Sequence, residues 1–189
     1  KIDWKVVKSD GNWLPIFEIV AHEIQDDMDC TGHGMSNILD ALLYAKFNES
    51  TNTSEAYING MAGTTREGGN SLSNILKTVY EFGWVKEEEW PIENRWKKIP
   101  QDIIDLGKNN LKTYQFGYDL VPMNLQGFIT ASQYSPLYTG GAAWAKNGSG
   151  LYYSFGSANH CFVGAEMATP FAFDSYDPFT KQLTKNYQF

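Results

Sequence analysis

The amino-acid sequence predicts an α+β fold, with helices in the first half of the chain and strands in the second. Apolar residues recur at helical spacing after Cys30 and again over residues 71–82. After Tyr114 the pattern changes to short apolar and aromatic runs separated by Gly and Pro, which are typical of strands. Helices followed by strands in this order favour two packed layers or lobes rather than an alternating α/β fold.

A chain of 189 residues fits one domain with a sizeable core. We therefore expect a single domain over 1–189. The change of pattern divides it into a helical lobe over about 25–112 and a β-rich lobe over about 113–189, to which the N-terminal segment is added.

The first helix is expected to follow a segment of loop character. Residues 1–29 include Gly11 and Pro15, so we predict that they are mostly extended or loop. The helix should begin at Cys30 and end near Phe47, with an apolar face formed by Met35, Ile38, Leu39, Leu42 and Leu43.

Two further helices and several strands complete the prediction. A helix should run from about Ser71 to Phe82 and end at Gly83, and a short one should start near Pro100. The strands are predicted at 137–144, 151–155, 161–167 and 171–175.

Composition excludes some classes of function. The net charge is −7 and the basic residues are scattered, with Lys97-Lys98 as the one adjacent pair, which argues against a nucleic-acid partner. No apolar run approaches the roughly 20 residues that span a bilayer, so we expect a soluble protein. Two cysteines are too few for a disulfide framework, which favours a reducing compartment.

Cys30 is the candidate nucleophile. It occupies the expected first turn of a long helix, where unpaired N–H groups and the helix dipole favour a thiolate. A cysteine nucleophile also needs a base and a group that orients the base. His22 lies in a charged segment before the helix, and His33 lies within the helix and is badly placed for the first turn. His160, at the predicted start of a strand, is the preferred base.

Asp174 is the candidate orienting group, because it ends the strand that follows His160 and two antiparallel strands could bring the pair together. Each residue also has a structural interpretation. A lone helical cysteine is usually a core residue, a histidine before an apolar run is often structural, and Asp174 could be a turn residue before Asp177-Pro178. Their joint order and spacing favour the catalytic interpretation.

The order of Cys30, His160 and Asp174 resembles that of papain-like cysteine peptidases. Three further blocks are similar to stretches of that family: Glu67-Gly68-Gly69-Asn70 with Gly83-Trp84-Val85 and Glu89-Trp90-Pro91-Ile92; Asn159-His160-Cys161-Phe162-Val163-Gly164; and Asp174-Ser175-Tyr176. The resemblance implies a groove between the two lobes. Gly68 and Gly69 would bind the substrate backbone there, and Asn159, beside the histidine, would also bind the substrate.

The sequence also departs from the family pattern. Around the nucleophile it has Met28-Asp29-Cys30-Thr31-Gly32 in place of Cys-Gly-Ser-Cys-Trp, and Asp174 replaces the usual Asn, which keeps an acceptor for the histidine. Gln25 lies five residues before Cys30 rather than six. It is either the oxyanion donor or an exposed loop amide, and the N–H of Cys30 would donate in both cases.

The resemblance therefore implies hydrolysis of a peptide or protein substrate through a thioester on Cys30, without a metal or cofactor. Two alternatives use the same fold. An amidase or acyl transferase, or a peptidase that trims leader peptides, would use the same three residues on another acyl donor. A non-catalytic structural or binding module is compatible with the unusual residues beside Cys30.

Overall fold

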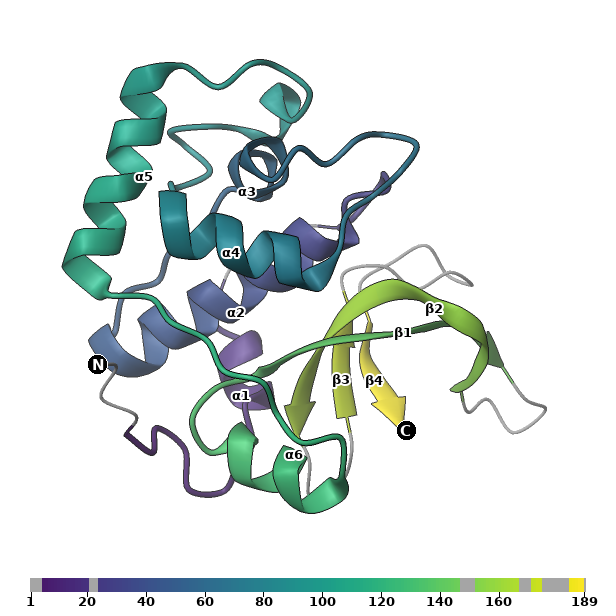
Figure 1. Ribbon diagram of the computed structural model, residues 1–189. Helices are drawn as coiled ribbons and strands as arrows, with labels where there is room; N and C mark the ends of the chain where they lie inside the picture. The colour runs from purple at the N-terminus through teal and green to yellow at the C-terminus, as the bar shows by residue number, and fades with distance from the viewer. Residues whose placement is uncertain (1–4, 21–23, 147–151, 167–170, 175–183, 189) are drawn as a thin grey trace.

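The computed structural model describes residues 5–20, 24–146, 152–166, 171–174 and 184–188, with side chains for 5–20, 24–141 and 156–166. The fold is α+β, as the sequence predicts, with helices in the N-terminal half and strands in the C-terminal half (Figure 1). The helices of the described residues are α1 Leu14–Phe17, α2 Cys30–Phe47, α3 Glu55–Met61, α4 Leu72–Phe82, the 3-10 helix η1 Ile92–Asn94, α5 Gln101–Tyr114 and α6 Leu125–Ser132.

The three predicted helices are confirmed as α2, α4 and α5. Ser71 caps α4 by accepting a hydrogen bond from the Asn74 N–H, and Gly83 follows its last residue with a positive φ of 71°. Three short helices, α1, α3 and α6, were not predicted, because four to eight residues hold too few turns to establish a periodic pattern.

Four strands of the described residues form one antiparallel sheet in sequence order: β1 Leu137–Lys146, β2 Tyr152–Glu166, β3 Phe171–Asp174 and β4 Thr184–Gln188. The expectation of separate strands at 151–155 and 161–167 is wrong, because β2 is continuous. Gly156 adopts a φ of +89° at a bulge, where the pairing with β1 shifts register between Ser154 and Ala158 and resumes on both sides. His160 consequently lies within β2 rather than at the start of a strand.

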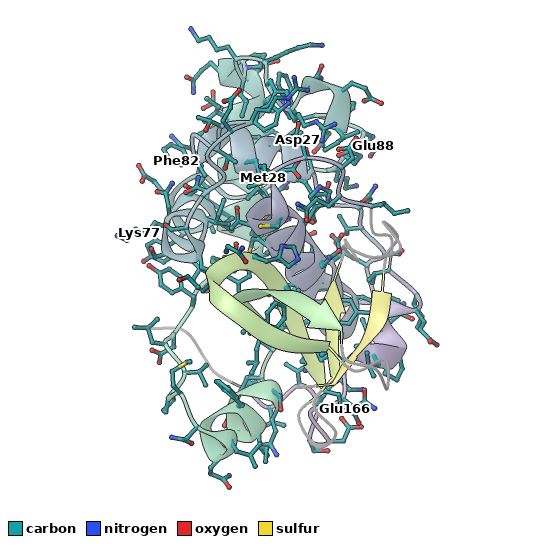
Figure 2. The ribbon with its side chains drawn as sticks, turned by 90° about the vertical axis from the view of Figure 1, so that its right-hand side faces the viewer. Asp27, Met28, Lys77, Phe82, Glu88 and Glu166 are labelled. Carbon is teal, nitrogen blue, oxygen red and sulfur yellow. The ribbon has the colours of Figure 1, made fainter. Side chains whose placement is uncertain are left out.

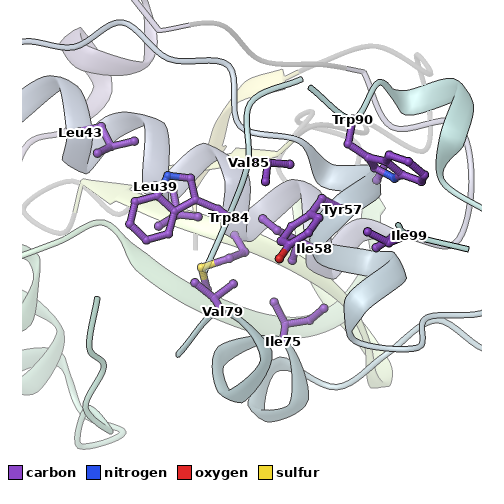
Figure 3. Packing of buried hydrophobic residues seen from close by; sticks show 12 residues of the cluster. Leu39, Leu43, Tyr57, Ile58, Ile75, Val79, Trp84, Val85, Trp90 and Ile99 are labelled. Atoms are coloured by element: carbon purple, nitrogen blue, oxygen red, sulfur yellow. The ribbon is translucent and has the colours of Figure 1, made fainter. Parts of the chain in front are cut away.

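Helix α2 is the centre of the molecule and lies between helices α3, α4 and α5 on one side and the sheet on the other (Figure 1). Most of its residues are buried, from Thr31 to Leu43, as expected for a helix that is covered on several sides. One side packs against α3, α4 and the segment after α4, in a cluster shown in Figure 3; its members include Met35, Leu39, Tyr57, Ile75, Val79 and Trp84.

The other side of α2 packs against α1 and β2. This second cluster consists of Trp13, Ile16, Phe17, Val20, Ile38, Ala41, Val163 and Ala165. Trp13 ties the N-terminal segment to the strands, because its backbone N–H donates to Ala165 O at 2.8 Å and its Nε1 donates to Ser132 O at 2.6 Å. These two bonds fix the start of α1 against the end of β2 and the last residue of α6. Among the described residues, no helix has the length and apolar character needed to cross a membrane.

Candidate active site

Cys30 is the first residue of α2, and its side chain is partly exposed. The loop that leads into it carries Asp27 and Met28, which Figure 2 shows above the strands. Cys30 and Cys161 form no disulfide bond. Cys30 lies in the first turn of α2, where backbone N–H groups have no acceptor within the helix.

Strands β1 and β2 pack directly against the first turns of α2. The Tyr138 hydroxyl on β1 donates a hydrogen bond to the Thr31 carbonyl at 2.6 Å. Gly34 leaves room for Cys161 on β2, because a Cβ added at Gly34 would lie 2.8 Å from the Cys161 sulfur. Burial first, and then the nearby thiol of Cys161, raise the pKa of Tyr138 well above its usual value, so its hydroxyl stays protonated as a donor.

His160 precedes the buried Cys161 on β2. Its side chain is partly exposed, and alternation along a strand directs it to the face opposite that of Cys161. The pairing of β1 with β2 shifts here: Gly141 pairs with His160, whereas Ala142 pairs with Ala158. Asn159 is therefore the extra residue of a bulge, and it is exposed. Bulges of this kind redirect neighbouring side chains and occur beside active sites.

Asp174 is the last residue of β3, as expected. The ladder between β2 and β3 pairs Val163 with Phe173. Continuing this antiparallel register by one residue places Asp174 opposite Phe162. His160 lies two residues before Phe162 on β2, so it is a diagonal neighbour of Asp174. The side chain of Asp174 lies outside the described part of the structure, as do Ser175 and Tyr176, so the contact between Asp174 and His160 stays a prediction.

The interpretation of Gln25 as an exposed loop amide is wrong, because its side chain is 8% exposed. Its Nε2 donates to the Asp27 carbonyl at 2.6 Å, whereas its buried Oε1 has no hydrogen-bond partner among the described residues. An amide nitrogen carries two N–H groups, so one donor remains beyond the bond to Asp27. The role of Gln25 as an oxyanion donor stays a prediction.

Gly68 and Gly69 lie close to the loop before Cys30. A Cβ added at Gly69 would lie 3.4 Å from the Met28 carbonyl oxygen, and Gly69 has a φ of +59°. Both glycine N–H groups donate to the Thr65 carbonyl, at 3.3 and 3.1 Å. Any pairing of a peptide with this turn would therefore use the glycine carbonyls rather than their N–H groups.

Comparison with known proteins gives the fold. No protein-family model matches the sequence, and no curated protein matches it. The proform of Amb a 11, a cysteine protease and major ragweed pollen allergen, superposes with a TM-score of 0.67 at 13% identity, over 100% of this chain and 64% of that chain. Digestive procathepsin L 3 of the Tenebrio molitor larval midgut gives a TM-score of 0.55 at 12% identity, over 93% and 61%.

The chain has a papain-like fold. It spans less than two thirds of the length of these two proforms. At 12% and 13% identity the likeness concerns the fold alone.

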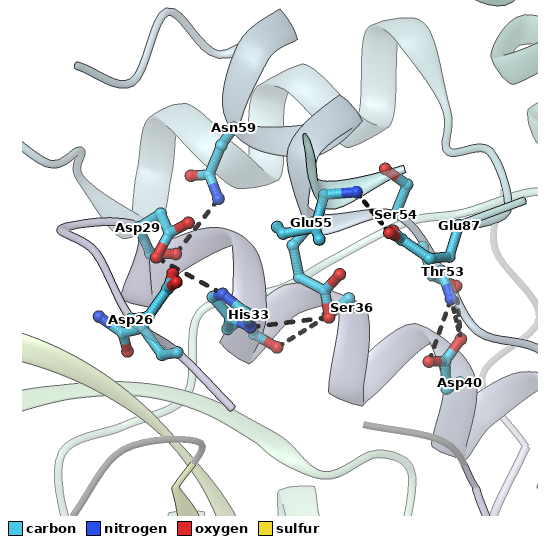
Figure 4. Close-up of polar contacts among 12 residues, drawn as sticks. Asp26, Asp29, His33, Ser36, Asp40, Thr53, Ser54, Glu55, Asn59 and Glu87 are labelled. Atoms are coloured by element: carbon cyan, nitrogen blue, oxygen red, sulfur yellow. Dashed lines mark hydrogen bonds and ion pairs between the residues drawn. The ribbon is translucent and has the colours of Figure 1, made fainter. Parts of the chain in front are cut away.

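A buried charged network beneath Cys30 was not predicted. His33 lies between two carboxylates, with Nδ1 3.7 Å from Glu55 Oε1 and Nε2 3.5 Å from Asp29 Oδ1 (Figure 4). Arg95 contacts Asp29 at 3.4 Å and also forms an ion pair with Asp26. Burial raises the pKa of Asp29, but the contacts with His33 and Arg95 outweigh it and leave that pKa below its ordinary value.

The sequence contains one signal for this network, the spacing of four residues between Asp29 and His33 at a helix start. The exclusion of His33 as the base agrees with its position, since it is 1% exposed and held between acids. Glu55, which contacts His33, and Arg95, which contacts Asp29, are distant in sequence from these residues, and no local pattern relates them.

Proposed function

We propose that this papain-like chain is a thiol peptidase in which Cys30 is the nucleophile, His160 the general base and Asp174 the group that orients His160. One observation carries the proposal. The strand that bears His160 packs against the helix that begins at Cys30, through the contact of Cys161 with Gly34. A cysteine at a helix start beside a histidine-bearing strand supplies the two groups that thiol acyl transfer needs.

In the proposed reaction, the Cys30 thiolate attacks the carbonyl carbon of a peptide bond. The tetrahedral oxyanion accepts a hydrogen bond from the Cys30 N–H and a second one from Gln25. As the carbon–nitrogen bond breaks, His160 donates its proton to the leaving amine and a thioester remains on Cys30. Water then attacks the thioester, His160 accepts a proton from it, and the acid product and the thiolate are released.

The substrate would lie in a groove between the helical lobe and the β-rich lobe. Gly68 and Gly69 would form one edge of this groove through their carbonyl groups, because residues without side chains let a peptide backbone approach closely. Asn159 would form the opposite edge beside His160, and its exposure in the bulge supports this role.

The test is hydrolysis of a mixed peptide library, followed by mass spectrometry of the products. Cys30→Ala, His160→Ala and Asp174→Ala should each lose activity, by at least about 1000-fold for the first two. Cys161→Ala is the matched control, because it also removes one cysteine sulfur, but from a buried position on β2. Activity in Cys30→Ala equal to that of the unmodified protein would contradict the proposal.

The amidase or acyl-transferase alternative predicts the same labelling of Cys30 with a different acyl donor. Incubation with glutamine amides, cell-wall fragments and leader peptides separates these activities from general peptide hydrolysis. If the chain is a non-catalytic module, Cys30 should show no fast, pH-dependent alkylation by iodoacetamide, since the reactive form of a cysteine is the thiolate and no base would be placed to generate it.

A further inference from the structure

The peptide group that joins Asp29 to Cys30 is held by an unusual number of donors. The Asp29 carbonyl accepts from the N–H of Gly32 at 3.0 Å and from the N–H of His33 at 3.3 Å, within the first turn of α2. It also accepts from Asn59 Nδ2 at 3.2 Å, and Asn59 comes from a different helix, α3 (Figure 4). The third donor is therefore a tertiary contact to the residue just before the candidate nucleophile.

Asn59 is fixed in the orientation that this contact requires. A carbonyl oxygen can only accept, so the Asn59 nitrogen must face Asp29. Its oxygen accepts from the Thr64 hydroxyl at 2.9 Å, and Thr64 Oγ1 accepts in turn from Asn70 Nδ2 at 2.9 Å. Asn59 and Thr64 are 1% and 7% exposed. The bonds form a directed chain from Asn70, the residue after Gly69, to the Asp29 carbonyl.

Gly32 is the residue that makes room for this chain. A Cβ added at Gly32 would lie 1.8 Å from Asn59 Nδ2 and 2.5 Å from its Cγ, distances that real side chains do not adopt. Any larger residue at this helical position would displace the Asn59 amide. Glycine weakens a helix at such a position. The close approach of Asn59 explains why glycine is nevertheless present at residue 32 in the first turn of α2.

We propose that Asn59 is a positioning residue for the oxyanion hole, acting through the Asp29 carbonyl to hold the N–H of Cys30 toward the substrate. The inference rests on the proposed function of Cys30. The C=O and N–H of one trans peptide group point in opposite directions, so a carbonyl held by Asn59 fixes the direction of the Cys30 N–H. A hydrogen bond to the carbonyl also polarises the peptide group and strengthens its N–H as a donor.

Two reagents separate this role from the reactivity of the thiol. A peptide aldehyde adds to Cys30 and places an oxygen in the oxyanion hole, whereas iodoacetamide alkylates the thiolate without using that hole. Asn59→Leu should weaken aldehyde binding and lower kcat by at least about 10-fold, a fraction of the loss caused by deleting an oxyanion donor. The alkylation rate and KM should stay within about twofold of the unmodified protein.

Further variants keep the test independent of folding. Gly32→Ala should reproduce the loss of aldehyde binding, because it displaces the same amide. The double variant Gly32→Ala with Asn59→Ala removes the atoms that clash, so its thermal unfolding should recover while its aldehyde binding stays weak. Thr64→Val should have a smaller effect of the same kind. Thr53→Val is the matched control, since it removes a buried hydroxyl that contacts Asp40 instead.

The possible outcomes are distinct. If the unmodified protein shows no alkylation of Cys30 and Cys30→Ala retains activity, the proposed function is wrong and the oxyanion role of Asn59 with it. If the unmodified protein reacts but Asn59→Leu binds aldehyde normally, only the positioning role is overturned. Parallel loss of alkylation and aldehyde binding also overturns it, because that result indicates general disruption of the site. Loss of aldehyde binding with alkylation retained supports it.

Discussion

His33 Nε2 lies 3.5 Å from Asp29 Oδ1, and both residues are 1% exposed. Asp29 immediately precedes Cys30, so the imidazole is one turn below the candidate nucleophile. A buried carboxylate at this position would otherwise oppose a neighbouring thiolate by charge repulsion. The contacts of Asp29 with His33 and Arg95 compensate for its charge and connect the start of α2 to η1 and the loop that follows it.

Replacing His33 should lower the stability of the whole protein. His33→Leu leaves the buried carboxylates of Asp29 and Glu55 without their shared partner, and breaking a buried pair in this way costs about 3–5 kcal/mol. Urea unfolding of the variant measures the loss. His33→Gln keeps an N–H donor and should lose less. A change below about 1 kcal/mol in His33→Leu would show that Arg95 and Ser36, the other partners of Asp29 and Glu55, satisfy the carboxylates without His33.

Asp40 should make stability fall as pH rises. Burial raises its pKa well above the usual value, even though Thr53 donates hydrogen bonds to the carboxyl. The stabilising form is the protonated one. Its contribution is complete below the unfolded pKa of about 3.9 and is lost, by about 1.4 kcal/mol per pH unit, as pH rises toward the folded pKa.

Asp40→Asn keeps an acceptor for Thr53 and cannot titrate. The free energy of unfolding of this variant, measured by urea from pH 4 to pH 8, should not show that decline, so the difference from the unmodified protein should grow with pH. Thr53→Val removes a donor to the carboxyl and should extend the decline to higher pH. Identical pH profiles for the unmodified protein and Asp40→Asn would show that Asp40 titrates normally.

Cys30 should be alkylated much faster than Cys161. The thiol of Cys30 is partly exposed at a helix start, whereas Cys161 is 2% exposed and packed against Gly34. Iodoacetamide at neutral pH, followed by peptide mapping, should give labelling at Cys30 at least about 10-fold faster in the native protein and similar rates in urea. Faster labelling of Cys161 in the native state would remove the basis for the assignment of Cys30.

The sequence predicts the long elements of this fold because their patterns are local. The helix from Cys30 to Phe47 and the helix ending at Gly83 each carry several turns of apolar spacing and a recognisable end. The sequence pattern divides the long β2 into two strands, because Gly156 and its polar neighbours resemble a turn. In the folded chain the pairing of β1 with β2 continues past them, and no single segment reveals that pairing.

The candidate site likewise combines features that local sequence patterns predict with contacts that they do not predict. The start of α2 at Cys30 and the end of β3 at Asp174 follow from local signals. The contact of Asn59 with Asp29 and the position of His33 between Asp29 and Glu55 depend on how α3 packs on α2. Because this packing sets the contacts between residues distant in sequence, composition and local spacing do not predict them.

Gly69→Ala tests where the substrate lies. The added Cβ would be at ordinary contact distance, 3.4 Å, from the Met28 carbonyl, so the fold can accommodate it apart from the backbone strain at a φ of +59°. That strain costs about 1–2 kcal/mol for a residue other than glycine. Because the methyl group would project beside the loop that leads to Cys30, KM for peptides should rise by about 10-fold, equivalent to about 1.4 kcal/mol of binding.

Gly63→Ala is the matched control for this strain. Gly63 has a similar φ of +69°, and a Cβ added there would meet no described atom within 4 Å. Both variants should therefore lose similar stability in thermal unfolding, while Gly63→Ala leaves KM unchanged. Alkylation of Cys30 by iodoacetamide should be the same in both, because neither change touches the thiol or His160. Equal KM values for Gly69→Ala and Gly63→Ala would show that the glycine pair is a structural turn and that peptides bind elsewhere.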